Sequence, residues 1–261
     1  VSALGAIYKY ARYLRKPKGT CPMIEVDKGK AAKIIQKALS EGREVLSPIE
    51  AADVALAYGI PVPEKPLVKS EEEAVKIAEK LGYPVVLEVE SLQIIHKTDV
   101  GGIKVNIKTP EEVIRAYREI MNNVRKLAPQ ALIKGIVVRK MLPQGEEVIV
   151  GMHRDPIFGP LIMFGSGGVL VGLVRDVSFR VAPITLEDVE EMMKETKVYK
   201  VLKGFRGKPE LDVDSVKDVI LRVAKLALDF PEISDIDINP LFVYEKGKGC
   251  TAVDVKIMIQ R

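Results

Sequence analysis

Tryptophan is absent from this chain of 261 residues, which also contains only six phenylalanines and eight tyrosines. Proteins that bind single-stranded nucleic acid stack bases on aromatic side chains, so this class is disfavoured. The net charge of +4, from 40 basic and 36 acidic residues, is too small to indicate a nucleic-acid partner. It leaves room for a local basic pocket that binds an anionic ligand.

Cysteine and long apolar runs are also scarce. The two cysteines, Cys21 and Cys250, provide neither a disulfide framework nor metal-ligand spacing, so zinc is excluded and the reducing cytoplasm is the expected location. No apolar run approaches the roughly 18 residues that a membrane span needs. The chain begins at Val1 without a signal-peptide pattern, which suggests a processed product or a fragment of something longer.

Helix and strand signals alternate along the first half of the chain. Ser47-Pro48-Ile49-Glu50 combines a capping box with a proline at the first helical position, and Ser70 with Glu73 caps a further helix. Strands and capped helices between about residues 44 and 137 predict an α/β unit, and an α+β unit ending in a hairpin is expected after it. Helices are expected at 1–15, 28–42, 48–59, 70–82, 109–127, 186–195 and 213–229, and strands at 83–89, 103–107, 131–141, 147–151, 161–164, 235–239 and 251–259.

The stretch Gln93–Gly102, QIIHKTDVGG, reads as a glycine-ended loop between two strands. Gly101 and Gly102 permit backbone conformations in which successive amides converge on a phosphate. His96 could carry a transferable group, and Lys97 and Lys104 add positive charge. The alternative is an ordinary turn, since a Gly-Gly pair between strands is common there.

The acidic segment near the end of the chain suggests a metal site. In a strand with the sequence DIDIN, Asp235, Asp237 and Asn239 share one face, and Asp254 lies on the expected partner strand. Hard oxygen ligands of this kind suit Mg²⁺ held together with nucleotide phosphates. A solvated face of an ordinary sheet is the alternative, although Asn239-Pro240 argues against it because proline should end the regular pairing there.

Three arginines are weaker candidates for anion contacts. Arg154, Arg175 and Arg180 could line the same pocket, but arginines on strands are usually surface charge. His153 is expected in a solvent-exposed turn formed by His153-Arg154-Asp155-Pro156.

Six motifs, in order, carry a family resemblance. From about Glu41 to Ile259 the chain resembles the ATP-grasp β subunit of ADP-forming acetyl-CoA synthetases, which are relatives of succinyl-CoA synthetase. The motifs are LSPIEAADVALAYGIPVP, GYPVVLEVES, QIIHKTDVGG, EVIVGMHRDPIFGPLIMFGSGG, RDVSFRVAPIT and DIDINPLFVY.

The resemblance implies an ATP-grasp fold of the α/β (α+β) class with two subdomains. Residues 21–137 would form the N-terminal subdomain with a lid loop, and residues 138–261 the C-terminal subdomain with a Mg²⁺-binding hairpin. Residues 1–20 resemble the tail of a CoA-binding α portion. The implied reaction converts acyl-CoA, ADP and phosphate to free acid, CoA and ATP, together with a CoA-binding α subunit or domain that carries a phosphohistidine segment, in a hetero-oligomer without nucleic-acid or membrane partners.

The resemblance also assigns roles to individual residues. It makes His96 a second phosphohistidine position and Asp237 an acidic contact of the phosphorylated histidine. It makes Asn239 and Asp254 the ligands of Mg²⁺. The implied ATP/ADP site comprises Glu88, Lys97, Gly101, Gly102, Arg139, Lys140, Met141, Glu147 and Arg180.

Three positions depart from the family pattern. Glu88 stands where a lysine usually contacts the ATP phosphates, Leu92 replaces a proline, and Gly172 replaces a glutamate. A carboxylate beside a triphosphate is unfavourable, since a unit charge pair at about 4 Å is worth roughly 4 kcal/mol at an effective dielectric constant of about 20. Lys97 or Lys104 could compensate. A non-catalytic module for assembly or regulation, or the ATP-grasp portion of a fused acyl-CoA synthetase-like acyltransferase, are the alternatives.

Overall fold

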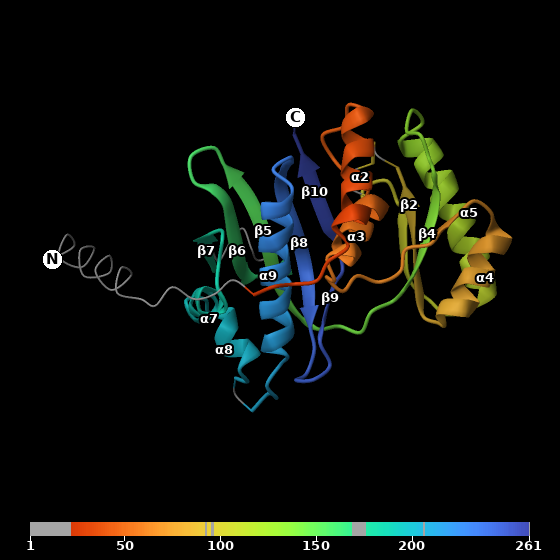
Figure 1. Ribbon diagram of the computed structural model, residues 1–261. Coiled ribbons are helices and arrows are strands. Elements are labelled where there is room, and N and C mark those ends of the chain that lie inside the picture. The colour runs from red at the N-terminus through yellow and green to blue at the C-terminus, as the bar shows by residue number, and fades with distance from the viewer. Residues whose placement is uncertain (1–21, 92, 95–96, 169–175, 206, 261) are drawn as a thin grey trace, which may run out of the picture.

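The structure, a computed structural model, describes residues 22–91, 93–94, 97–168, 176–205 and 207–260. The helix expected at 1–15 therefore lies outside the described residues, as do Leu92, His96, Gly172 and Arg175. The described chain forms two β-sheets that lie side by side with helices packed on them (Figure 1).

The smaller sheet has four strands, with α4 (Glu71–Leu81) and α5 (Pro110–Leu127) packed on it. Its strand order is β1 (Leu67–Val68), β4 (Gly135–Lys140), β2 (Val85–Glu90) and β3 (Ile103–Ile107). Both helices begin at capped residues, because the Ser70 and Thr109 hydroxyls accept hydrogen bonds from amides three residues later. Every residue of β2 is buried, as expected for a central strand.

The larger sheet has six strands. Its order is β10 (Val255–Ile259), β8 (Ile233–Val243), β5 (Glu146–Asp155), β6 (Gly159–Ser166) and β7 (Val177–Val181), and β9 (Cys250–Ala252) pairs with β8. Helices α7 (Leu186–Lys194) and α9 (Val213–Asp229) pack on this sheet, and α9 crosses in front of it in Figure 1. The short helix α8 (Val198–Leu202) follows α7. In the part of the chain that the structure describes, no helix combines the length and the apolar character needed to cross a membrane.

Helices α2 (Lys28–Ser40) and α3 (Pro48–Ala57) pack with the larger sheet, although they precede the smaller one in the sequence. Ile35 and Val54 share a core with Val150 of β5, whereas the core of the smaller sheet is separate. The Leu46 amide also donates to the Ile257 carbonyl at 3.1 Å. The packing thus groups residues 31–62 with the second half of the chain, unlike the expected grouping at 21–137; the subdomain boundaries themselves stay a prediction.

Several strand boundaries differ from the sequence expectation. The segment from His153 to Asp155 belongs to β5 and is not a turn, because all three residues pair with β6, and His153 also pairs with β8. The proline at 240 does not end β8, since the pairing resumes after an irregularity opposite Val148–Val150. The expected strand 251–259 is divided into β9 and β10, and β1, β7 and α8 were not predicted.

Tyr58, the residue that ends α3, tests the attachment of this helix to the larger unit. Its side chain is fully buried, its hydroxyl donates to Asp229 Oδ2 at 2.8 Å, and its ring lies edge-on to Phe230. We expect Tyr58→Phe to lower the free energy of unfolding by about 1–2 kcal/mol, because the half-buried Asp229 carboxylate loses a hydrogen bond. Tyr117→Phe is the control, since its hydroxyl has no hydrogen-bond partner among the described residues. Equal losses in urea denaturation of the two variants would contradict this account.

Candidate functional site

Strand β2 carries a buried glutamate on the face opposite its apolar core. Glu88 is 7% exposed, and its carboxylate lies 3.3 Å from Lys97 Nζ and 3.6 Å from Arg139 Nε. Burial alone would raise the pKa of Glu88, but Lys97 and Arg139 outweigh it and hold the pKa below its ordinary value. Glu88 is therefore the charged centre of a cationic cluster, and its negative charge is balanced within the protein.

The glycine loop folds back onto β2. The Gly102 amide donates to the Lys97 carbonyl at 2.7 Å, and the Gly102 carbonyl accepts from Val89 at 2.7 Å. Gly101 has φ +60° and a Cβ there would lie 2.7 Å from Asn123 Nδ2, so glycine is required. The Gly101 amide also donates within the loop, to Thr98. Phosphate binding by these two amides stays a prediction, and it would require these hydrogen bonds to open.

Two predicted nucleotide contacts, Lys140 and Met141, lie at the end of β4 and bond to the backbone just before β2. Lys140 Nζ donates to the carbonyls of Gly82 and Tyr83 at 2.7 and 2.9 Å, and the Met141 amide donates to Pro84 at 3.0 Å. The ammonium group of Lys140 is thus engaged at the start of β2 in this structure.

A second group of predicted residues lies on β8. Asp235, Asp237 and Asn239 alternate with the buried Ile236 and Ile238, so the expectation that the three polar side chains share one face is confirmed. Asp254, between β9 and β10, lies opposite Asn239. This position follows from the pairing of Ile238 with Val255 and from the hydrogen bond of 2.9 Å between the Val253 amide and the Pro240 carbonyl.

Glu147 of β5 joins this group through the glycine cluster. Asn239 Oδ1 accepts a hydrogen bond from the Gly168 amide at 3.1 Å, and the Gly167 amide donates to the Glu147 carbonyl at 2.9 Å. The Glu147 carboxylate lies directly over Gly168, where any Cβ would collide with it. Gly168 has φ +73°, so glycine is required for both reasons. The cluster thus brings Glu147 and Asn239 to one place.

These oxygen-bearing side chains suit Mg²⁺, which prefers carboxylate, amide and phosphate oxygens. Asp237 Oδ1 is buried without a hydrogen-bond partner among the described residues, and burial, reinforced by Asp254, raises the pKa of Asp237 despite the opposing effect of Lys256. Within the described ranges no three His, Cys, Asp or Glu side chains lie close enough to hold a metal ion by themselves. Asn239 and Asp254 would therefore need further oxygens from a bound phosphate.

The remaining candidates have other partners in the structure. Arg180 forms a paired ion contact with Glu195, with N–O distances of 2.7 and 3.0 Å, and Arg154 donates to three backbone carbonyls near the end of α9. His153 is exposed, as expected. Its Nδ1 lies 2.6 Å from Asp235 Oδ1. The Lys104 ammonium lies 2.5 Å from Glu119. In this structure the charges of Arg180 and Lys104 are balanced by these carboxylates.

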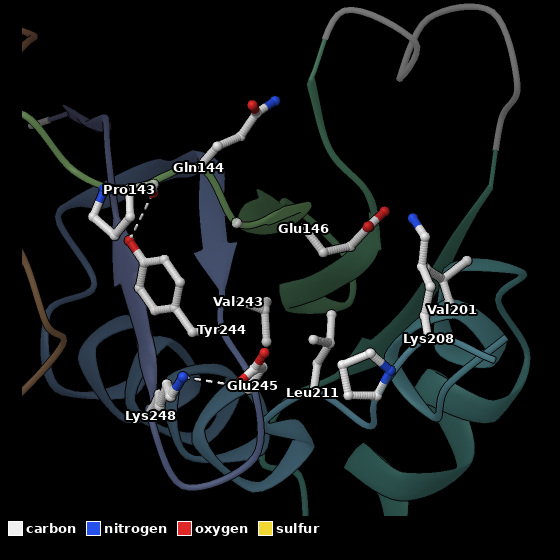
Figure 2. A pocket seen from close by; sticks show the side chains of 12 residues that line it. Pro143, Gln144, Glu146, Val201, Lys208, Leu211, Val243, Tyr244, Glu245 and Lys248 are labelled. Atoms are coloured by element: carbon white, nitrogen blue, oxygen red, sulfur yellow. Dashed lines mark hydrogen bonds and ion pairs between the residues drawn. The ribbon is translucent and has the colours of Figure 1, made fainter.

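Sequence reasoning missed two features. Lys65 lies near both groups of site residues, but a lone lysine in an extended, proline-rich segment gives no periodic signal. A cavity of about 450 Å³ lies between the start of β5, the end of β8 and the segment after α8 (Figure 2). None of the predicted site residues lines it; its walls are formed by Pro143, Gln144, Gly145, Glu146, Val201, Lys208, Pro209, Leu211, Val243, Tyr244, Glu245 and Lys248.

Comparison with known proteins gives consistent matches. A family profile for the ATP-grasp domain matches residues 37–259. The chain is 50% identical over 230 residues to the acetate–CoA ligase (ADP-forming) I subunit beta of Pyrococcus furiosus, covering 88% of this chain and 98% of that one. It is 44% identical over 260 residues to acetate–CoA ligase (ADP-forming) I of Archaeoglobus fulgidus, covering 99% of this chain and 37% of that one.

A solved structure matches over the same region. It is the dinucleotide-forming acetyl-coenzyme A synthetase 1 of Ca. Korarchaeum cryptofilum with coenzyme A and Mg-AMPPCP, in which the phosphohistidine segment points towards the nucleotide-binding site. The TM-score is 0.79 at 43% identity, with 88% of this chain and 100% of that chain covered.

The buried charge of Glu88 predicts a pH-dependent loss of stability in Glu88→Gln. We expect this variant to be about 3 kcal/mol less stable at neutral pH, because Lys97 and Arg139 lose their shared counter-charge. A lowered folded-state pKa stabilises the protein above the unfolded pKa of about 4.3, and this contribution is lost as the pH falls through the folded pKa. The difference between parent and variant should therefore shrink in acid.

The matched control is Glu119→Gln, which removes an exposed carboxylate from Lys104. Denaturant titrations from pH 3 to 8 should show little change in this control at any pH. A constant deficit of Glu88→Gln across that range would contradict the ion-pair explanation.

Proposed function

Because the chain belongs to the ATP-grasp family of ADP-forming acetate–CoA ligase β subunits, we propose that it is the nucleotide-binding β subunit of an acid–CoA ligase. It would act in the conversion of acyl-CoA, ADP and phosphate to free acid, CoA and ATP. The observation that carries the proposal is the 50% identity to the Pyrococcus β subunit, of which this chain covers 98%. The geometry supports it, since a cationic group and a group of oxygen ligands lie on neighbouring sheets.

The reaction is divided between this chain and an α partner. The partner would bind CoA and carry the phosphohistidine segment, and the two would form a hetero-oligomer. The name of the Pyrococcus relative, a β subunit, supports this division. So does the Korarchaeum structure, whose phosphohistidine segment points towards a nucleotide site. The same proposal places the protein in the cytoplasm. It also takes residues 1–20 to resemble the tail of a CoA-binding α portion.

The nucleotide would bind where the two groups of residues face each other. Lys97 and Arg139 would stabilise the phosphates, while Glu88 keeps these two cations in place. Asn239 and Asp254, with Glu147 nearby, would hold Mg²⁺ against the same phosphates. The bound Mg²⁺ would neutralise charge that develops on the transferred phosphoryl group.

We further propose that His96 receives the phosphoryl group from the α partner and passes it to ADP. The bond between phosphorus and the imidazole nitrogen breaks, a bond to the terminal phosphate oxygen of ADP forms, and the imidazole regains its lone pair. Asp237 would contact this imidazole. Its carboxyl group is suited to a hydrogen bond with a ring nitrogen because its oxygen is buried without a partner in the described part of the chain.

The chain has two histidines, which provide a matched pair for testing this step. His96→Ala, assayed with the α partner, should lower ATP synthesis on the order of 10³-fold or more, because the phosphoryl acceptor is lost. Binding of MgADP should change little. His153→Ala should retain the parent activity, since the side chain of His153 is exposed on β5 and hydrogen-bonds to Asp235 of β8.

The direct measurement is transfer of radiolabelled phosphate from ATP to this chain, followed by separation from the partner. Acid-labile label is expected on the parent and on His153→Ala. Parental turnover by His96→Ala would exclude the phosphoryl role.

The Mg²⁺ ligands are tested by the metal dependence of ADP binding. Asp254→Asn should reduce the gain in ADP affinity on adding Mg²⁺ by about tenfold, because a neutral amide is a weaker ligand than a carboxylate. Asp235→Asn is the control, since Asp235 lies on the same face of the sheet but its carboxylate pairs with His153. Calorimetric titrations of ADP with and without Mg²⁺ measure both, and an equal effect of the two substitutions would argue against a ligand role for Asp254.

A further inference from the structure

The segment of residues 60–66 runs from one sheet to the other. Near its start, the Pro61 carbonyl accepts a hydrogen bond from Ala252 of β9 at 2.8 Å. Near its end, the Pro66 carbonyl accepts from Val138 of β4 at 3.1 Å. Lys65 therefore lies on a segment whose backbone is hydrogen-bonded to both sheets.

The register of β1 places Lys65 relative to the cationic cluster. Leu67 pairs with Val137 in an antiparallel ladder, so two residues earlier Lys65 comes opposite Arg139. Residues directly opposite one another in such a ladder project to the same face of the sheet. Arg139 is the residue that contacts Glu88, so Lys65 shares the face of the buried ion cluster.

The electrostatic surroundings of Lys65 include residues of both sheets. Its half-buried ammonium interacts with Glu88 on the smaller sheet and with Asp254 beside the larger one, and it is repelled by Lys97 and Arg139. Burial is the strongest influence and lowers the pKa of Lys65, with Glu88 and Asp254 compensating only in part. The attraction of Glu88 and Asp254 thus offsets only part of the cost of burying the Lys65 ammonium.

Lys65 has no carboxylate partner at ion-pair distance among the described residues. The two oxygens of Glu88 already face Lys97 and Arg139, and no ion pair joins Lys65 to a carboxylate within the described residues. Glu90, the next residue on that face of β2, is fully buried, and burial raises its pKa. Lys65, Lys97 and Arg139 therefore lie around Glu88, with Asp254 also acting on Lys65, and a bound anion would give Lys65 a direct partner.

We propose that Lys65 is a polyphosphate-binding residue, whose ammonium contacts the terminal phosphate of a nucleoside diphosphate between the two sheets. The inference rests on the proposed function, because it takes the nucleotide site to lie between these sheets. It assigns different tasks to the three cations: Lys97 and Arg139 are fixed by Glu88, whereas Lys65 turns to the ligand. The competing explanation is that Lys65 only joins Glu88 to Asp254 as a structural tie.

The test compares Lys65→Met, Lys65→Arg and the control Lys69→Met in the full chain with its α partner. Lys69 is an exposed lysine four residues further on, so its substitution removes the same charge outside the cluster. Binding of MgADP and of AMP is measured by calorimetry, and the melting temperature of each variant is recorded. We expect Lys65→Met to raise the Kd for MgADP about tenfold and the Kd for AMP less than twofold, because AMP lacks the terminal phosphate.

Lys65→Arg should recover most of the MgADP affinity, and Lys69→Met should match the parent. Parental MgADP affinity in Lys65→Met would overturn the inference and leave the proposed function standing, as would a lower melting temperature without a change in Kd. Equal weakening of AMP and MgADP would also overturn it, since the effect would not involve the terminal phosphate. If the parent itself does not bind MgADP, the proposed function fails, and the inference fails with it.

Discussion

A buried carboxylate at the centre of the smaller sheet constrains the arrangement of the site. Removing a charged glutamate from water is unfavourable unless opposite charges lie close to it. Glu88 therefore holds Lys97, in the middle of the glycine loop, and Arg139, on the neighbouring strand, against β2. The same contacts answer the objection that a negative charge at this position would repel a nucleotide, because the protein supplies two cations for one carboxylate. The loop and the sheet are thereby joined at the place where phosphates would bind.

The two sheets have separate apolar cores, yet Lys65 interacts with Glu88 on the smaller sheet and with Asp254 beside the larger one. The segment from α3 to β1 connects them, with its backbone hydrogen-bonded to both β9 and β4. The cations come from the smaller sheet, and the oxygen ligands come from β5, β8 and the turn before β10. In the proposed site, the two groups together would offer positive charge to the phosphates and oxygen ligands to the metal.

Local signals predicted the capped helices and the shared face of Asp235, Asp237 and Asn239, because caps and strand alternation depend on nearby residues. Long-range packing was not predictable in this way. The sequence does not show that α2 packs with strands more than a hundred residues later, nor that Arg180 is balanced by Glu195. The ATP-grasp family was recognisable from motifs before any of these contacts were known. The roles of individual site residues depend on partners that motifs do not specify.

The hydrogen bond between the Gly168 amide and Asn239 has a thermodynamic consequence. An amide oxygen has two lone pairs, so Asn239 Oδ1 can accept this hydrogen bond and coordinate a cation at the same time. Both interactions then depend on the orientation of one side chain. By linkage, if fixing Gly168 strengthens cation binding, cation binding must stabilise the glycine cluster by the same free energy. The order of the glycine cluster and the binding of the metal would thus strengthen each other through the single oxygen atom Asn239 Oδ1.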